Sequence, residues 1–296
     1  MKIYINHDEI EFTLEQESSL GELYKSVEKW LSERSFSITE MFLDDEELFI
    51  TEKEKWDELH FNDKESIHFT ALTLPQLKSQ NLKTILNYCL MLQRSLKDGN
   101  LELLNELLKE YSFIEDSYEV LLEDFAHSIK DHMSNVLSNN GFIPEYARTE
   151  ENVKTVLEAF IMLEAVIQGR LDEVTDPFKS GKECYAAIVN LMPRMEEVSL
   201  LLQTGKDKDA MDVIICFSEL FQKLLRIYTY LPEDTQENHN EDLKAYINDI
   251  SGILKDLTDA FTSEDFVLMG DLMEYEIMPK MKSFPRFFES INSQGY

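Results

Sequence analysis

The hydrophobic periodicity of this 296-residue chain changes near residue 75, and that change constrains the fold more than any other feature. Before Pro75, apolar residues alternate with polar ones in short runs, as they do in half-buried β-strands. After Pro75, apolar residues recur every three or four positions over long stretches, as they do in amphipathic helices. The sequence therefore predicts an α+β protein, with a small sheet domain over residues 1–74 and a larger all-helical bundle domain over residues 75–296.

The N-terminal domain begins with two alternating runs and a helical pattern. The turn residues His7-Asp8 separate the two runs, which predicts a β-hairpin with one buried face. Ser19-Leu20-Gly21-Glu22 has the form of a capping box, so a helix is expected to begin there. The apolar residues behind these predictions are Ile3, Ile5, Ile10, Phe12 and Leu14 in the hairpin, and Leu20, Leu23, Val27 and Trp30 or Leu31 in the helix.

Further apolar segments complete this domain. Alternation predicts a strand at Met41 and Leu43, and a last strand in which Ile67, Phe69 and Ala71 point to one side. Between them, residues 48–50 are short and apolar. The predicted order of elements is β-β-α-β-β, with a short late strand and a final alternating one.

This strand order and two short sequences resemble ubiquitin and the bacterial ubiquitin-like β-grasp proteins. The sequences are Phe42-Leu43-Asp44-Asp45-Glu46-Glu47-Leu48 and Asp63-Lys64-Glu65-Ser66-Ile67-His68-Phe69. The resemblance covers about a quarter of the chain and implies a β-grasp fold for residues 1–74. Those relatives end in an activated Gly-Gly, whereas Leu72-Thr73-Leu74-Pro75 runs on without a glycine. Conjugation and sulfur transfer are therefore not expected, which leaves a structural cap or a docking module.

The remainder of the chain is predicted to form a bundle or an array of helical hairpins. The expected helices are residues 76–98, 100–138, 150–172, 178–203, 207–231, 239–261 and 264–290. Several junctions share one pattern, in which a left-handed glycine ends one helix and a polar residue caps the next. These junctions contain Gly99, Gly169 and Gly205, and Thr262-Ser263-Glu264-Asp265 is a similar junction without glycine. The irregular spacing of the glycines does not favour a regular solenoid.

Two apolar stripes are clearest in the late helices. Their members are Ile214, Phe217, Phe221, Leu224 or Leu225 and Tyr228 in one, and Ile250, Ile253 or Leu254, Leu257 and Phe261 in the other. Residues 202–211 and 263–276 are similar to uncharacterised bacterial helical proteins, some of which accompany motility genes. That resemblance implies no catalytic residues.

The balance of charge excludes several classes of partner. The chain has 58 acidic and 28 basic residues, a formal net charge of −30, which disfavours binding to nucleic acids and to anionic membrane surfaces. The N-terminus begins with a strand pattern, and no segment is apolar enough to span a membrane, so a cytoplasmic protein is expected. The widely separated Cys89, Cys184 and Cys216 favour reduced, buried thiols over disulfides.

His127 is the main candidate for metal chemistry. Asp124 and Asp131 fall on the same face of a predicted helix, as the ligands of a metal do. A di-iron bundle needs two Glu-x-x-His pairs and further Glu residues, which this sequence does not offer, so a solvated helix face is the alternative. The motifs of phosphate loops, nucleophile elbows and zinc helices are also missing from the sequence. We therefore predict no catalytic residue, metal or cofactor, and expect a protein that is not an enzyme.

Binding of other proteins is the leading functional prediction. Flexible methionines suit grooves that accept varied apolar helices, and core filling is their alternative use. The candidate partner-binding residues are Met211, Met269, Met273, Phe284, Phe287 and Phe288. With the acidic charge, they predict a non-enzymatic adaptor or chaperone-like protein. Its partners are expected to be basic proteins or amphipathic helices, bound through the helical domain, the sheet domain or both.

Two alternatives belong to other classes. A metal-dependent carboxylate enzyme requires Asp124 and His127 to face inward beside other carboxylates. A purely architectural subunit would use its surface for assembly and bind no client. The sequence does not specify an oligomeric state.

Overall fold

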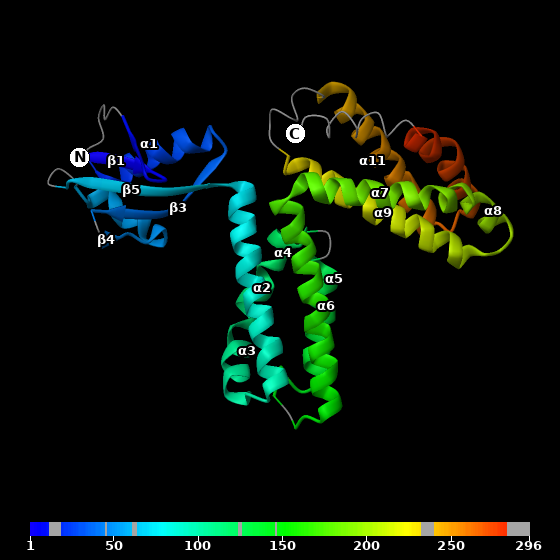
Figure 1. Cartoon of the computed structure of the whole chain (residues 1–296), viewed down its shortest axis with the longest axis horizontal. Helices are drawn as coiled ribbons and strands as arrows, with labels where there is room; N and C mark the ends of the chain where they lie inside the picture. Colours follow the sequence, from blue (N-terminus) through cyan, green and yellow to red (C-terminus); the bar gives the residue numbers. More distant parts are fainter. Residues whose placement is uncertain are drawn as a thin grey trace. The chain divides into compact units, whose positions relative to one another are not determined.

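The computed structural model of the chain describes residues 1–11, 19–44, 46–60, 64–123, 126–145, 147–231 and 240–282, without the side chains of residues 240–244 and 247. Within these residues, an N-terminal five-stranded sheet is followed by helices, which confirms the predicted α+β class (Figure 1). The sheet ends at Thr73, and the first long helix begins at Leu74. The chain divides into two compact units, residues 1–168 and residues 169–296, so the first unit contains the sheet and the first helices.

Residues 1–73 form a sheet module. Its elements are β1 (Lys2–Ile5), β2 (Asp8–Ile10), α1 (Leu20–Ser32), β3 (Phe36–Leu43), β4 (Glu46–Glu47), the 3-10 helix η1 (Ile50–Glu58) and β5 (Ser66–Thr73). The strand order across the sheet is β2-β1-β5-β3-β4, in which β1 and β5 are parallel and the other neighbours antiparallel. Three strands follow α1, one more than predicted, because Glu46 and Glu47 pair with the end of β3. The short apolar run at residues 48–50 leads into η1.

The β1–β2 hairpin and α1 both form where local sequence features predicted them. β1 and β2 pair around Asn6 and His7, one residue earlier than the predicted His7-Asp8 turn. Ser19 Oγ accepts the N–H of Glu22, and Glu22 Oε2 accepts the N–H of Ser19, each at 3.3 Å, which confirms the capping box. Phe12 and Leu14 lie outside the described residues. Besides the predicted inward residues of the strands and α1, the core contains Trp56 of η1, which the sequence pattern did not indicate.

A β-bulge in β3 sets which residues of that strand face the core. The register opposite β5 shifts between Ile38 and Glu40, so the direction of the side chains inverts at this point. Ile38 therefore packs against the core before the bulge, while Met41 and Leu43 are buried after it. Phe42 and Glu40 consequently lie on the opposite, solvent-facing side of the sheet.

Helices make up most of the remaining described residues. They are α2 (Leu74–Asp98), α3 (Leu101–Asp116), α4 (Tyr118–Leu121), α5 (Ala126–Asn139), α6 (Glu150–Thr175), α7 (Pro177–Glu196), α8 (Val198–Gln203), α9 (Asp207–Thr229), α11 (Asn240–Thr262), α12 (Phe266–Asp271) and the π-helical η3 (Leu272–Ile277). The single helices expected over residues 100–138 and 178–203 were wrong. The first divides into α3, α4 and α5, with Glu123 in a left-handed conformation after α4, and the second divides at Glu197. No helix in the described part of the chain is both long and apolar enough to cross a membrane.

Three of the predicted helix junctions share one closure. Gly99, Gly205 and Glu264 have positive φ angles of 65°, 72° and 56°, respectively. In each junction the next residue donates its N–H to the carbonyl five residues earlier, at 2.9 Å in all three cases. This confirms the predicted junctions at Gly99, Gly205 and Thr262–Asp265. The junction expected at Gly169 was wrong, because this residue lies inside α6.

The core of the second unit is formed by α7, α9 and α11 with α12 and η3. The stripe of α9 is buried as predicted through Leu224, and Ile227 then replaces the half-buried Tyr228. In α11, Phe261 is exposed and Ala260 fills its expected place in the core. Cys184 is buried, but Cys216 is exposed, so the prediction that all three thiols are buried was wrong for Cys216.

Candidate functional site

Five side chains form one row across the solvent-facing side of the sheet. In the strand register, Tyr4 of β1 pairs with Glu9 of β2 and with His68 of β5. Phe42 of β3 pairs with His68 on one side and with Glu47 of β4 on the other. We call Glu9, Tyr4, His68, Phe42 and Glu47 the cross-sheet row. Three aromatic rings occupy its centre, and a carboxylate stands at each end.

The aromatic part of the row is ordered by stacking and by the hairpin. The rings of Tyr4 and His68 stack with centroids 4.4 Å apart and an angle of 6° between their planes. Asn6, with a φ of 49°, and His7, with a φ of 77°, form the two-residue connection between β1 and β2. The Asn6 amide donates to the carbonyl of Ala71 and accepts the N–H of Ala71, each at 2.8 Å. These bonds fix β1 against β5, and hence Tyr4 beside His68.

Polar groups lie beside the aromatic centre at both ends. Glu40 lies two residues before Phe42 on the same side of β3 and accepts the Thr70 hydroxyl at 3.1 Å. Glu9 accepts Lys2 Nζ at 2.9 Å and the Tyr4 hydroxyl at 3.5 Å. A shallow hollow of about 740 Å³ opens on this face. Its lining residues are Asn6, His7, Glu40, Phe42, Asp44, His68, Phe69 and Thr70.

Asp44 closes one edge of this hollow. Its Oδ1 accepts the backbone N–H groups of Ser66 and Glu65, both at 3.0 Å, and Lys64 lies 3.6 Å from Oδ2. These partners, among which the Ser66 N–H has the largest effect, hold the pKa of the Asp44 carboxyl below its usual value. Asp44 thus joins the turn after β3 to the start of β5, and its carboxylate is already engaged within the module.

The cross-sheet row combines exposed carboxylates with half-buried aromatic rings. Tyr4, Phe42 and His68 are half-buried, whereas Glu9 and Glu47 are exposed. A flat aromatic centre with a polar rim is the arrangement that protein interfaces use, because the rings supply apolar area and the rim supplies orientation. The row is therefore suited to binding a polypeptide.

The sequence contained a signal for this row that the prediction did not use. Tyr4, Phe42 and His68 each lie between two residues that were predicted to point inward. Alternation alone therefore placed all three on the outer side. It did not show that they are neighbours, because the pairing of β1, β5 and β3 joins segments far apart in the chain.

The predicted partner-binding methionines lie mainly inside the second unit. Met269 and Met273 have no exposed surface and pack in its core. The surface position predicted for these two residues was therefore wrong. Their burial has a physical reason, since unbranched thioethers fill the irregular space between α12, η3 and the neighbouring helices. Met211 is half-buried at the margin of this core. Phe284, Phe287 and Phe288 lie outside the described residues.

The structure also places the predicted metal-site residues. His127 and Asp131 are exposed on α5, whereas Asp124 lies outside the described residues. Among the side chains that the structure describes, no group of three or more His, Cys, Asp or Glu residues could hold a metal ion. His127 and Asp131 thus occupy the solvated helix face that was the alternative interpretation.

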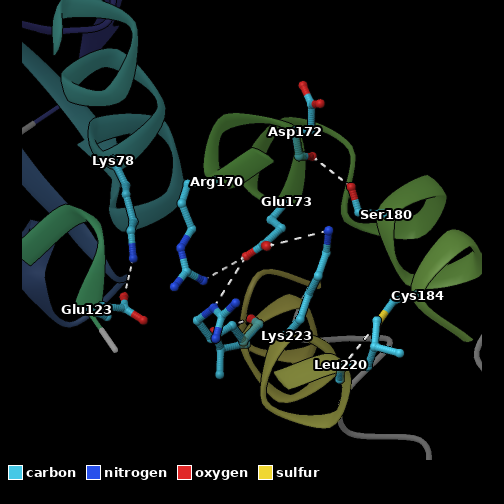
Figure 2. Close-up of polar contacts among 11 residues, drawn as sticks. Lys78, Glu123, Arg170, Asp172, Glu173, Ser180, Cys184, Leu220 and Lys223 are labelled. Atoms are coloured by element: carbon cyan, nitrogen blue, oxygen red, sulfur yellow. Dashed lines mark hydrogen bonds and ion pairs between the residues drawn. The ribbon is translucent and has the colours of Figure 1, made fainter. Parts of the chain in front are cut away.

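Ion pairs with at least one buried side chain occur in the helical part of each unit. In the second unit, Glu173 near the end of α6 lies 3.2 Å from Arg170 and 3.7 Å from Lys223 (Figure 2). Arg226 lies 3.4 Å from the same carboxylate. The side chains of Arg170 and Glu173 are each only 4% exposed. In the first unit, buried Lys78 pairs with Glu123 (Figure 2). Glu173 joins the end of α6 to α9, which is a structural role.

Comparison with known proteins gives two partial matches. Residues 1–73 match the family model described as TP0873 N-terminal domain, and residues 180–286 match the one described as Domain of unknown function (DUF8042). The first match ends where β5 ends. No curated protein and no solved structure matches the chain.

Proposed function

We propose that this protein is a non-enzymatic, cytoplasmic adaptor or chaperone-like protein that binds a partner polypeptide through the cross-sheet row. The observation that carries the proposal is the row itself, with three aromatic rings side by side between carboxylates. Strand pairing places these rings at fixed positions, so little side-chain freedom is lost when a partner covers them. Buried aromatic anchors contribute roughly 2 kcal/mol or more each to typical interfaces.

The rest of the chain is consistent with this role. A net charge of −30 keeps the protein soluble and attracts basic partners over distances of about a Debye length. The parallel pair of β1 and β5 within a mixed sheet supports assignment of residues 1–74 to the ubiquitin-like β-grasp proteins. The association with motility has only the likeness of the late helices as its support.

The test is site-specific photo-crosslinking in cells. The photoreactive amino acid p-benzoylphenylalanine replaces Phe42 in one variant and Phe49 in a control variant. Phe49 belongs to the same module and is 61% exposed, but it lies outside the cross-sheet row. We expect a defined crosslinked partner from position 42 and not from position 49. The crosslink should disappear when Tyr4→Ala is added, because the ring beside His68 is then missing.

Other outcomes would favour other functions. A crosslink from position 42 to a second copy of this chain would support the architectural alternative. Identical products from both positions, or none from position 42, would refute binding through the cross-sheet row. The enzyme alternative is tested separately, by the metal content of the purified protein.

A further inference from the structure

We propose that the partner presents an arginine to the cross-sheet row, which seats its guanidinium over the Phe42 ring between the carboxylates of Glu40 and Glu47. This inference rests on the proposed function and specifies the chemistry of the partner. The occupant is therefore an arginine-bearing segment of a basic polypeptide.

The strand geometry places the two carboxylates on adjacent sides of one ring, Glu40 along β3 and Glu47 across on β4. Glu47 lies directly across from Phe42 in the β3–β4 pair, where side chains are about 5 Å apart. Glu40 lies two residues along the same face of β3, a distance of roughly 7 Å. A guanidinium above the ring is thus within reach of both carboxylates.

The charge around Phe42 differs from that at the other end of the row. Glu9 already has Lys2 as a partner, and the Asp44 carboxylate receives two backbone N–H groups and Lys64. Glu40 receives the neutral Thr70 hydroxyl. The carboxylates of Glu40 and Glu47 therefore make the Phe42 end of the row electronegative, which favours a cationic occupant.

The ring selects arginine among the cations. A guanidinium is planar, stacks on an aromatic face and donates several hydrogen bonds in its own plane. Donors in that plane point outward in several directions, so one guanidinium can reach a carboxylate along the strand and another across the sheet. A lysine ammonium is a strongly hydrated point charge that stacks poorly, and an acidic segment would be repelled.

The test uses the full-length ¹⁵N-labelled protein and synthetic peptides as probes. The peptide acetyl-Ser-Leu-Arg-Leu-Arg-Ser-amide is compared with versions that carry Lys or Glu in place of Arg, by NMR titration at low salt. We expect the Arg peptide to shift backbone signals of β3, β4 and β5. The Lys peptide should bind roughly threefold or more weakly, and the Glu peptide should not bind.

Charge-neutral variants locate the contact. The double variant Glu40→Gln/Glu47→Gln should bind the Arg peptide roughly 3- to 10-fold more weakly. The control Glu33→Gln/Glu54→Gln removes the same charge from two exposed residues of the sheet module outside the row and should bind normally. Equal weakening in both doubles would mean a response to net charge alone and would overturn the inference. Equal binding of the Arg and Lys peptides would also overturn it.

The two proposals fail in different ways. If the position-42 crosslink depends on Tyr4 while the peptides fail to discriminate, the face binds a partner of another chemistry. If the crosslink is absent and only the peptide binds, the contact is not used in the cell, and the proposed function fails.

Discussion

Replacing Glu264 with glycine is expected to stabilise the second unit. Glu264 has a φ of 56°, yet it occupies the position that Gly99 and Gly205 fill in junctions with the same hydrogen bond. A left-handed conformation costs an L-residue about 1–2 kcal/mol, a cost that glycine avoids. Glycine has greater conformational freedom in the unfolded chain, which offsets about 0.5–1 kcal/mol of that advantage. The net gain is therefore roughly 0.5–1 kcal/mol.

A second contribution must be separated from the backbone effect. Glu264 is exposed at the C-terminal end of α11, where a negative charge opposes the helix dipole. Glu264→Gln removes the charge and keeps the backbone cost, so the difference between Glu264→Gly and Glu264→Gln isolates the conformation. Gly205→Ala is the reciprocal variant. An added Cβ at Gly205 meets no atom within 4 Å, so a loss of about 1 kcal/mol there would reflect the φ of 72° alone.

Urea unfolding monitored by far-UV circular dichroism is the assay. The two tryptophans, Trp30 and Trp56, belong to the sheet module, so their fluorescence reports on that module and not on the second unit. With an m-value of about 2 kcal/mol per molar urea, Glu264→Gly should raise the helical midpoint by about 0.3–0.5 M relative to Glu264→Gln. An equal or lower midpoint would refute the reasoning.

Three further predictions follow from the buried and charged groups. Glu173→Gln removes the carboxylate that pairs with buried Arg170 and should destabilise the second unit by about 3–5 kcal/mol. The same urea assay measures this loss. An unchanged midpoint would mean that the pair does not stabilise the fold. Folding lowers the pKa of Asp44, so this carboxylate stabilises the sheet module above the ordinary Asp pKa, and the stabilisation is lost as the pH falls. Asp44→Asn should therefore lower the urea midpoint measured by tryptophan fluorescence at neutral pH. It should also make that midpoint decline less between neutral pH and about pH 3. A pH profile identical to that of the wild type would contradict this assignment. Ellman's reagent should modify only exposed Cys216 rapidly in the native protein. Burial raises the pKa of Cys89 to about 12 and that of Cys184 to about 11, so these two thiols should react slowly. Fast reaction of more than one thiol would show that the core opens.

Errors in predicting the helices arose where several solutions satisfied the local pattern. Gly169 resembles a junction in sequence, but α6 continues through it to Thr175. Phe261 has the spacing of a core residue, whereas Ala260, one position earlier, is the residue that the core accepts. Packing in the core of the second unit decided between Ala260 and Phe261. A single glycine costs a helix only about 1 kcal/mol, so Gly169 does not need to end α6.

Local sequence signals were sufficient to predict the elements whose hydrogen bonds close within a few residues. The capping box at Ser19 and the left-handed ends at Gly99 and Gly205 were readable because donor, acceptor and backbone conformation all lie in one short segment. Alternation likewise indicated the inward residues of β1, of β5 and of the second half of β3.

The candidate site, in contrast, depends on strand pairings between segments that are far apart in the chain. The cross-sheet row requires β1 beside β5, β5 beside β3, and a bulge near Thr39 that turns Phe42 outward. A shift of one residue in any of these pairings would move every side chain of that strand to the other face. Register between distant segments depends on the packing of the whole module. The alternation of apolar residues could therefore predict that the aromatic residues face outward, but not that they are neighbours in the sheet.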